Sequence, residues 1–410
     1  MSLPAETIHP VKSKQAEDVE IADIFRRHIN DYQKRYKLHP DHFKVTSDIM
    51  ECRTEFLGGH IHVCSECSHE IELYNSCGNR HCPKCQTVAK ARWLESRKQE
   101  LLPVPYFHTV FSLPHEINPL ALCNKRTIYN LLFKSASDTM LAFGENPKNG
   151  LGGKLSLIGI LHTWDQQLND HIHLHCLVPG GVLTSDKSEF ITSKESFLFP
   201  VKALSKVFRG KFMEGLQDAF EKRKLKFPGR TANLETSTGF RAMTHELWSK
   251  EWVVYSKPPF SGPKTVLEYM ARYTHRVAIS NYRIRACEDG KVTFTWRDRR
   301  KNITKTMSLD AVEFIRRFLL HVVPRRFMRI RHFGLFANRC KKKNIQLCLE
   351  LLGKEAEKVQ PAKPVEEIML ELTGKDILCC PICKKGTLVK KYEIKKHLFG
   401  SGGYDFITPP

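Results

Sequence analysis

Three histidines alternate in the stretch DHIHLHCLVPGG, which spans residues 170–181. If this stretch is a β-strand, His171, His173 and His175 share one face, because side chains two residues apart point the same way. The intervening apolar side chains then point into a core. Imidazole is the commonest side-chain metal ligand near neutral pH. We therefore predict a metal-binding or catalytic role for this face; the alternative is a strand whose polar face is merely rich in histidine.

Two tyrosines, Tyr269 and Tyr273, are four residues apart in TVLEYMARYTHR (265–276), which we predict to be a helix. Residues at this spacing share a helix face, and such a pair is commonly a packing stripe. Here Arg272 and Arg276 add positive charge beside the phenols, and no GxSxG or Cys–His motif offers another nucleophile. A phenolate could attack a DNA phosphate and conserve the bond energy in a phosphotyrosine ester. The metal would polarise and orient that phosphate.

Two CxxC pairs in the N-terminal part have the spacing of a zinc site. The chain has 14 cysteines, and their clustering favours zinc in a reducing compartment over a secreted disulfide scaffold. Cys64 and Cys67 form one pair, and Cys82 and Cys85 form the other. We predict that a short hairpin over 69–74 brings the pairs together, so that four thiolates hold one structural Zn²⁺.

Other cysteines leave several arrangements open. Near the first pairs lie three more candidate ligands: Cys52, Cys77 and His81. They could hold a second zinc ion or pack around the first, or His81 could replace one thiolate. Far along the chain, Cys380 and Cys383 form half of a zinc site, whose missing ligands could be Cys340 and Cys348. The alternative is a vestigial knuckle.

The bulk composition favours a polyanionic partner. Sixty-five Lys and Arg against 44 Asp and Glu give 65 − 44 = +21 in 410 residues, and nucleic acid is the default partner for such an excess. The run RRFMRIRHFGLFANRCKKK (325–343) contains eight basic residues and no acid. Its candidate phosphate contacts are Arg325, Arg326, Arg329, Arg331, Lys341, Lys342 and Lys343; the alternative is a solvated basic face. No long apolar run or secretory signal is apparent, so we expect a cytoplasmic protein associated with the nucleoid.

The elements that position these residues follow from the local patterns. Apolar runs predict strands at 104–113 and 154–164, and the second is close enough to the histidine strand to pair with it antiparallel. Glu288-Asp289-Gly290 predicts a hairpin turn. We divide the chain into four parts: an N-terminal helical segment (1–48), a zinc-binding DNA-binding module (49–102), a catalytic domain (103–345), and a linker with a C-terminal tail (346–410).

Several stretches together resemble the transposases of rolling-circle insertion sequences, which belong to the HUH endonuclease superfamily. They are HIHLHCLVPGG, PPFSGPKTVLEYMARYTHRVAISN, EFIRRFLLHVVPRRFMRIRHFGLFANR, SCGNRHCPKCQ and LLPVPYFHTVFSLPHE, and the similarity spans about residues 45–345. The resemblance implies an α+β fold: an HUH-type central antiparallel sheet flanked by helices, preceded by a small zinc-binding module.

The same resemblance implies roles for individual residues. His173 and His175 would hold a catalytic Mg²⁺ or Mn²⁺, and candidates near the strand for a third ligand are Asp165, Gln166 and Gln167. Tyr273, which is followed by the basic residues of the sequence YTHR, would be the first nucleophile. Tyr269 would be a second nucleophile or a structural residue. The substrate would be single-stranded DNA at element ends and target sites, nicked through a 5′-phosphotyrosine and joined by strand transfer. The alternatives are a replication initiator or relaxase, and an inactive zinc-based nucleic-acid-binding protein.

Overall fold

The computed structural model describes residues 19–98, 100–194, 198–257, 265, 268–269, 273–274, 276–298, 301–354 and 363–396. The chain forms two compact units, each assembled from separate segments. One contains residues 1–92, 275–322 and 361–410, and the other contains residues 93–274 and 323–360. Within the described ranges, none of the helices has the length and apolar character needed to cross a bilayer.

A five-stranded antiparallel sheet is the centre of the 93–274/323–360 unit. Its strand order is β12 (Ile330–Gly334), β4 (Ser156–Trp164), β5 (Asp170–Pro179), β3 (Tyr106–Ser112) and β8 (Val254–Lys257). β4 and most of β5 are buried along their length, which explains why apolar residues occur on both faces of these strands. The predicted pairing of 154–164 with the histidine strand is confirmed.

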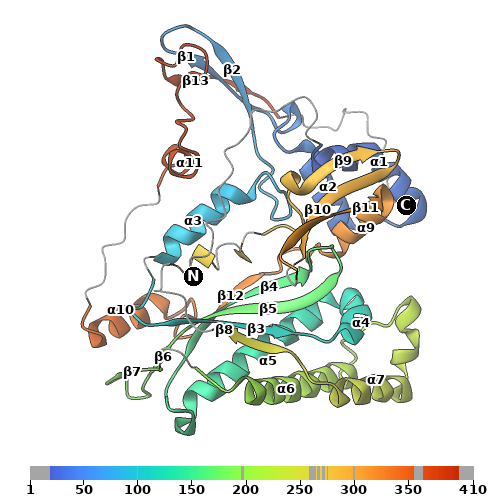
Figure 1. Cartoon of the computed structure of the whole chain (residues 1–410), viewed down its shortest axis with the longest axis vertical. Helices are drawn as coiled ribbons and strands as arrows, with labels where there is room; N and C mark the ends of the chain where they lie inside the picture. The colour runs from blue at the N-terminus through green and yellow to red at the C-terminus, as the bar shows by residue number, and fades with distance from the viewer. Residues whose placement is uncertain are drawn as a thin grey trace. The chain divides into compact units, whose positions relative to one another are not determined.

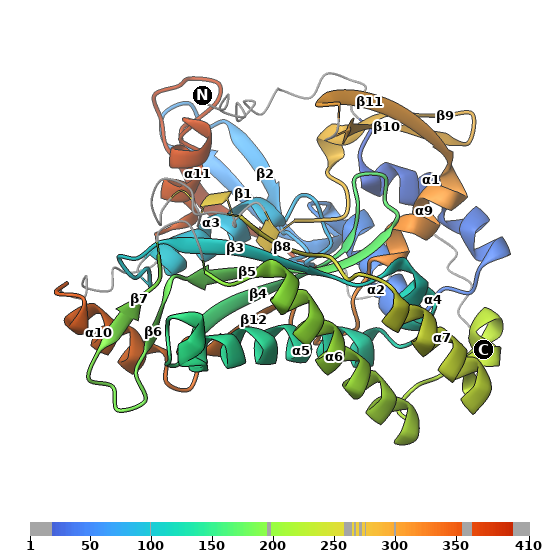
Figure 2. The same cartoon turned by 60° about the horizontal axis from the view of Figure 1, so that its bottom comes forward.

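Helices cover one face of this sheet (Figure 2). They are α4 (Asn118–Cys123), α5 (Lys125–Glu145), α6 (Val201–Glu221) and α7 (Ser237–Ser249). Ile172, Leu174 and Cys176 of β5 enter the hydrophobic core on this side, as the alternation predicts. The opposite face carries a second apolar cluster to which α10 (Lys341–Leu351) contributes. The hairpin β6 (Gly181–Leu183) and β7 (Phe190–Thr192) and three short 3₁₀ helices, η2 (His115–Ile117), η3 (Pro147–Asn149) and η4 (Gly229–Glu235), complete the unit.

The other unit contains two small sheets and several helices. β9 (Ile284–Glu288), β10 (Lys291–Asp298) and β11 (Ile303–Asp310) form one antiparallel sheet, which packs against α9 (Ala311–Leu320). The turn between β9 and β10 has positive φ at both Asp289 (48°) and Gly290 (70°), as in the predicted tight hairpin. α9 also packs against α1 (Ile21–Arg35), which contacts α2 (Pro40–Glu51). A short 3₁₀ helix, η5 (Asn281–Arg283), precedes β9.

The second small sheet pairs strands from the N-terminal and C-terminal parts of the chain (Figure 1). β1 (Gly59–Cys64) lies between β2 (Glu70–Tyr74) and β13 (Leu388–Ile394), and both pairings are antiparallel. The 3₁₀ helix η1 (Glu55–Leu57) precedes β1, and α11 (Val365–Thr373) precedes β13. α3 (Gln86–Lys98) follows the cysteine-rich segment. The α+β class, the antiparallel central sheet with its flanking helices and the small cysteine-rich module agree with the sequence-based expectation.

Candidate active site and cysteine clusters

Three imidazoles gather on the sheet face opposite α5 and α6. His173 and His175 alternate on β5, and His162 on β4 is paired directly with His173. Opposed residues of an antiparallel pair point to the same face, so the register itself gathers the rings. All three side chains are buried, and one nitrogen of each lies within 4.8 Å of the others.

Hydrogen bonds to backbone carbonyl oxygens fix the orientations of the His173 and His162 rings. His173 donates from Nδ1 to the carbonyl oxygen of His171 at 2.7 Å, which leaves its Nε2 lone pair facing His175 Nε2 at 3.1 Å. His162 donates from Nε2 to the carbonyl oxygen of Tyr273 at 2.6 Å. A metal-binding histidine usually has its second nitrogen held in this way.

His108 on β3 contacts the ring of His175, the third imidazole of the group. Its Nε2 lies 2.8 Å from Nδ1 of His175, and the two rings are stacked. Burial, assisted by the charge of Lys257, lowers the pKa of His108 to about 4, so this imidazole is neutral at neutral pH. A neutral His108 can accept the Nδ1 proton of His175, and Nε2 of His175 then remains available to a cation.

The two tyrosines lie against the imidazoles. Tyr273 is buried, its ring centroid lies 4.3 Å from that of His175, and its hydroxyl donates to the hydroxyl of Tyr269 at 2.7 Å. Tyr269 is less buried, and the ammonium group of Lys257 lies 5.6 Å from its ring centroid. Both residues have helical backbone, so the predicted spacing does place the phenols on one face.

His162 is the site residue that the sequence did not single out. The suggested third ligands lie in the β4–β5 turn, and Asp165 is outside the group of three. Asp165 accepts from the amides of Gln167 and Asn169 at 2.8 Å each, so this carboxylate closes the turn. The signal that could have found His162 was the predicted antiparallel pairing, once its register with His173 is fixed.

The cysteines form two groups, which corrects the prediction of one site shared by the first two CxxC pairs. Cys82 and Cys85 gather with Cys52 and Cys77. A second group contains Cys64, Cys67, Cys380 and Cys383. The reason is the hairpin: Cys64 and Cys67 lie at its β1–β2 turn, whereas Cys52 and Cys77 flank its base. Strands of this length separate the two ends by about 15–20 Å.

This arrangement also settles the open partners. Cys340 and Cys348 are not in the group with Cys380 and Cys383. His81 is buried but belongs to neither group. In the first group, Cys85 Sγ lies 3.5 Å from Cys52 Sγ and 3.6 Å from Cys77 Sγ. Four thiolates at Zn–S distances of about 2.3 Å would be about 3.8 Å apart, so the group fits a tetrahedral zinc ion.

The predicted DNA contacts divide by exposure. The exposed ones are Arg325, Arg326, Lys342 and Lys343. Arg329 is only 8% exposed, and Arg331 lies over the rings of Phe133 and Phe327 while donating to Asn130. Lys341 forms an ion pair with Glu100. These three therefore have internal packing roles that the basic composition concealed. Arg276 is half-buried, and Arg272 lies outside the described residues.

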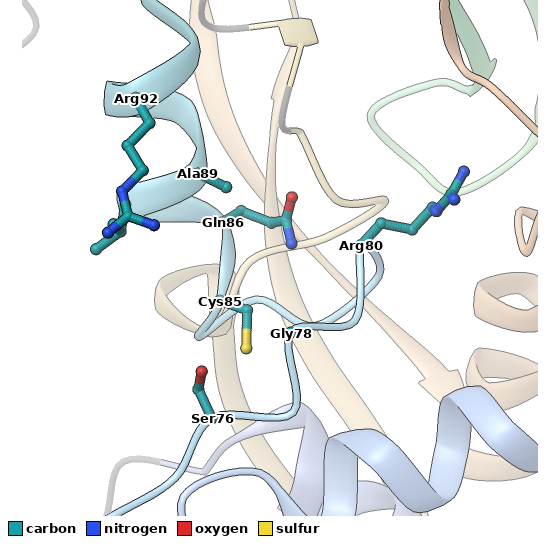
Figure 3. Close-up of a pocket in the computed structure, with 8 residues that line it drawn as sticks. Ser76, Gly78, Arg80, Cys85, Gln86, Ala89 and Arg92 are labelled. Atoms are coloured by element: carbon teal, nitrogen blue, oxygen red, sulfur yellow. The ribbon is translucent and has the colours of Figure 1, made fainter. Parts of the chain in front are cut away.

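A pocket of about 350 Å³ lies beside the first cysteine group (Figure 3). Its lining includes Arg80, which lies between Cys77 and Cys82, together with Gln86 and Arg92 of α3. The lining includes no acidic side chain. Burial lowers the pKa of Arg80, although a guanidinium remains charged at neutral pH. Gln86 and Arg92 therefore offer donors and positive charge to an anion, whereas the Arg80 side chain points away from Arg92 (Figure 3).

Comparison with known proteins identifies the family. The family model described as "Putative transposase" matches residues 156–344, and the model described as "Transposase zinc-binding domain" matches residues 24–113. The "Putative transposase y4qJ" of Sinorhizobium fredii (strain NBRC 101917 / NGR234) is 43% identical over 375 residues, which cover 90% of this chain and 94% of the relative. The "Transposase for insertion sequence element IS801" of Pseudomonas savastanoi pv. phaseolicola is 27% identical over 328 residues, covering 78% of this chain and 75% of the relative. No solved structure matches. The chain belongs to the IS91 family of insertion-sequence transposases with an N-terminal zinc-binding domain, and is thus a DNA-binding and DNA-cleaving enzyme.

Proposed function

We propose that this transposase nicks single-stranded DNA at the ends of its element through a 5′-phosphotyrosine and then transfers the strand, as in rolling-circle transposition. The carrying observation is the position of Tyr273, whose ring lies 4.3 Å from His175 and whose hydroxyl is bonded to that of Tyr269. The phenol pair and the imidazoles thus line one site on one sheet face.

In the proposed step, the Tyr273 oxygen attacks the phosphorus of the scissile phosphodiester. A bond forms between that oxygen and phosphorus, the bond from phosphorus to the 3′-oxygen breaks, and the leaving oxygen takes up a proton to give a 3′-hydroxyl. The Tyr273 hydroxyl donates to the Tyr269 oxygen, so Tyr269 can relay the proton: it accepts the Tyr273 proton as it gives its own hydroxyl proton to solvent. The ester keeps the energy of the broken bond, so a later 3′-hydroxyl can reverse the step.

His162, His173 and His175 would hold the catalytic cation. Three imidazoles within 4.8 Å suit a divalent transition ion better than Mg²⁺, which prefers oxygen ligands and would take most of them from water and phosphate. When bound there, Mn²⁺ or Mg²⁺ would polarise the scissile phosphate and orient it for in-line attack. His108 would keep His175 in the tautomer that binds.

Tyr269 has a second proposed role. Because its hydroxyl lies 2.7 Å from that of Tyr273, it can reach the same phosphate position after a small change of its side chain. A two-tyrosine enzyme would use one phenol for the donor strand and the other for the target strand. The cation of Lys257 over the Tyr269 ring favours a phosphate at that position.

Two basic surfaces would hold the DNA backbone. One carries the exposed side chains of Arg325, Arg326, Lys342 and Lys343, and the other is the pocket with Gln86 and Arg92 beside the first cysteine group. Contacts of this kind bind phosphates without reading sequence and weaken as salt rises. In the first cysteine group, Cys52, Cys77, Cys82 and Cys85 would hold the structural zinc ion that shapes the pocket wall.

The test is incubation with labelled single-stranded DNA from the end of the element, with Mn²⁺, with Mg²⁺ or with chelator. We expect an SDS-resistant protein–DNA product that requires the cation, and no such product from Tyr273→Phe. Replacement of both His173 and His175 by Ala should remove nicking while the protein keeps its cysteine-bound zinc. Nicking that persists in the double variant would contradict the assignment of the cation site.

A further inference from the structure

Two CxxC knuckles from opposite ends of the chain meet within one unit. Cys64 Sγ lies 3.6 Å from Cys383 Sγ, and Cys67 Sγ lies 3.7 Å from Cys380 Sγ. A disulfide would require about 2.05 Å, whereas thiolates around one tetrahedral zinc ion are about 3.8 Å apart. The four sulfur atoms therefore have the spacing of a metal site.

The knuckles share one backbone conformation. In each, the residue four positions after the first cysteine donates its amide to the carbonyl oxygen of that cysteine: Ser68 to Cys64 at 3.2 Å and Lys384 to Cys380 at 3.0 Å. The same two residues have positive φ, 54° for Ser68 and 56° for Lys384. Positive φ is uncommon for residues other than glycine, so its recurrence at equivalent positions indicates two copies of one local fold.

Backbone amides point at the sulfur atoms. Glu66 donates to Cys64 Sγ at 3.4 Å, and Gly386 donates to Cys383 Sγ at 3.3 Å. Such bonds stabilise thiolate ligands of a metal. Gly386 also packs directly against Cys64 Sγ and the side chain of Glu66, and a Cβ at this position would lie well inside contact distance of both. The two knuckles thus close tightly on each other.

Few apolar contacts hold this part of the molecule together. Among the described residues, its separate hydrophobic cluster consists of Cys64, Cys380 and Leu388, with Ile71 and Cys383 packed beside them. Most side chains of β13 are exposed. A three-stranded sheet with so small a core is marginal in water unless a metal or disulfide is added.

We infer that Cys64, Cys67, Cys380 and Cys383 bind a second structural zinc ion, which completes a zinc ribbon from the two ends of the chain. The zinc-binding domain that matches at residues 24–113 is then incomplete by itself. Residues 378–394 supply half of its second metal site and its third strand. This site does not depend on the proposed DNA chemistry.

The test counts cysteine-bound metal in the full-length protein. Zinc is measured by elemental analysis, and Co²⁺ replaces it so that the thiolate-to-cobalt charge-transfer band reports only cysteine sites. Cys380→Ser/Cys383→Ser should lose one zinc per chain and about half of that band. The matched control is Cys379→Ser, which changes the neighbouring half-buried cysteine outside the group and should keep both.

Cys77→Ser/Cys82→Ser should also lose one zinc, and all four substitutions together should lose two. An unchanged cobalt band in Cys380→Ser/Cys383→Ser overturns the inference, as does a wild-type protein with one cysteine-bound zinc. Gly386→Ala replaces no ligand but places a Cβ against Cys64 Sγ, so it should weaken zinc retention against a chelator and accelerate amide exchange in β1 and β13. Unchanged retention and exchange in Gly386→Ala would contradict the closed ribbon.

Discussion

His162→Ala gives the sharpest view of how the sheet positions the active site. This buried imidazole lies in the group with His173 and His175, and it donates to the Tyr273 carbonyl oxygen at 2.6 Å. Removal leaves a buried carbonyl without this donor, which costs about 1–3 kcal/mol. If this free energy is lost because Tyr273 no longer keeps its position for attack, the activation free energy rises by the same amount and nicking slows about 5- to 150-fold.

The same substitution should weaken metal binding. Loss of one of three ligands should raise the Mn²⁺ concentration for half-maximal nicking at least about tenfold, or about 1.4 kcal/mol. His162→Gln, whose amide can both donate and ligate, should recover part of both effects. The assay is single-turnover cleavage of labelled single-stranded DNA across a Mn²⁺ titration.

His171→Ala is the matched control. His171 is half-buried on the same strand face, outside the group of three, and its carbonyl oxygen, which accepts from His173, survives the substitution. We expect little change in its Mn²⁺ requirement. If His162→Ala shows the Mn²⁺ requirement of the wild type, His162 is not a ligand, even if the maximal rate falls.

The remaining predictions concern the second phenol, a helix carboxylate and the basic run. Tyr269→Phe should still form the covalent product with Tyr273, about tenfold more slowly because one hydrogen bond is lost, whereas strand transfer should fail if Tyr269 is the second nucleophile. Glu313 on α9 is held by Arg316, then by Arg317, and these bonds lower its pKa from 4.5 to about 2. A carboxylate with a lowered pKa stabilises the fold above pH 4.5 and loses that contribution as the pH falls towards 2. In denaturant titrations, Glu313→Gln should therefore be less stable than wild type by about 1 kcal/mol at pH 7, after solvent screening. Below pH 2, the variant and the wild type should be equally stable. Arg326→Ala and Lys342→Ala should each lower DNA affinity and reduce the salt slope by about one, whereas Arg331→Ala should lower thermal stability with little change in that slope, as salt-dependent binding curves and melting experiments would reveal.

Local patterns predicted the parts of the site that depend on periodicity. The alternation in β5 located His173 and His175, the four-residue spacing placed both phenols on one face, and the Asp289-Gly290 turn followed from its residue types. These features are set by neighbours in the sequence.

The rest depends on contacts between distant segments. His162 joins the site only through the strand register. The two CxxC pairs near the N-terminus have the same local pattern, and only the hairpin between them and the return of β13 decide their partners. A basic run likewise does not tell which of its side chains are buried, as Arg329 demonstrates. Local patterns did not predict the helices η4 and α7.

The central claim, that Tyr273 attacks phosphorus beside the three imidazoles, is tested most directly by the identity and polarity of the covalent product. A single-stranded substrate from the element end is labelled at its 3′ end or its 5′ end, and the adduct is digested and analysed by mass spectrometry. We predict that the 3′-labelled fragment remains attached through its 5′-phosphate to the peptide containing Tyr273, while the 5′-labelled fragment is released with a free 3′-hydroxyl. Attachment of the 5′-labelled fragment, attachment at a residue other than Tyr273, or cleavage with no covalent product under any metal condition would contradict the account.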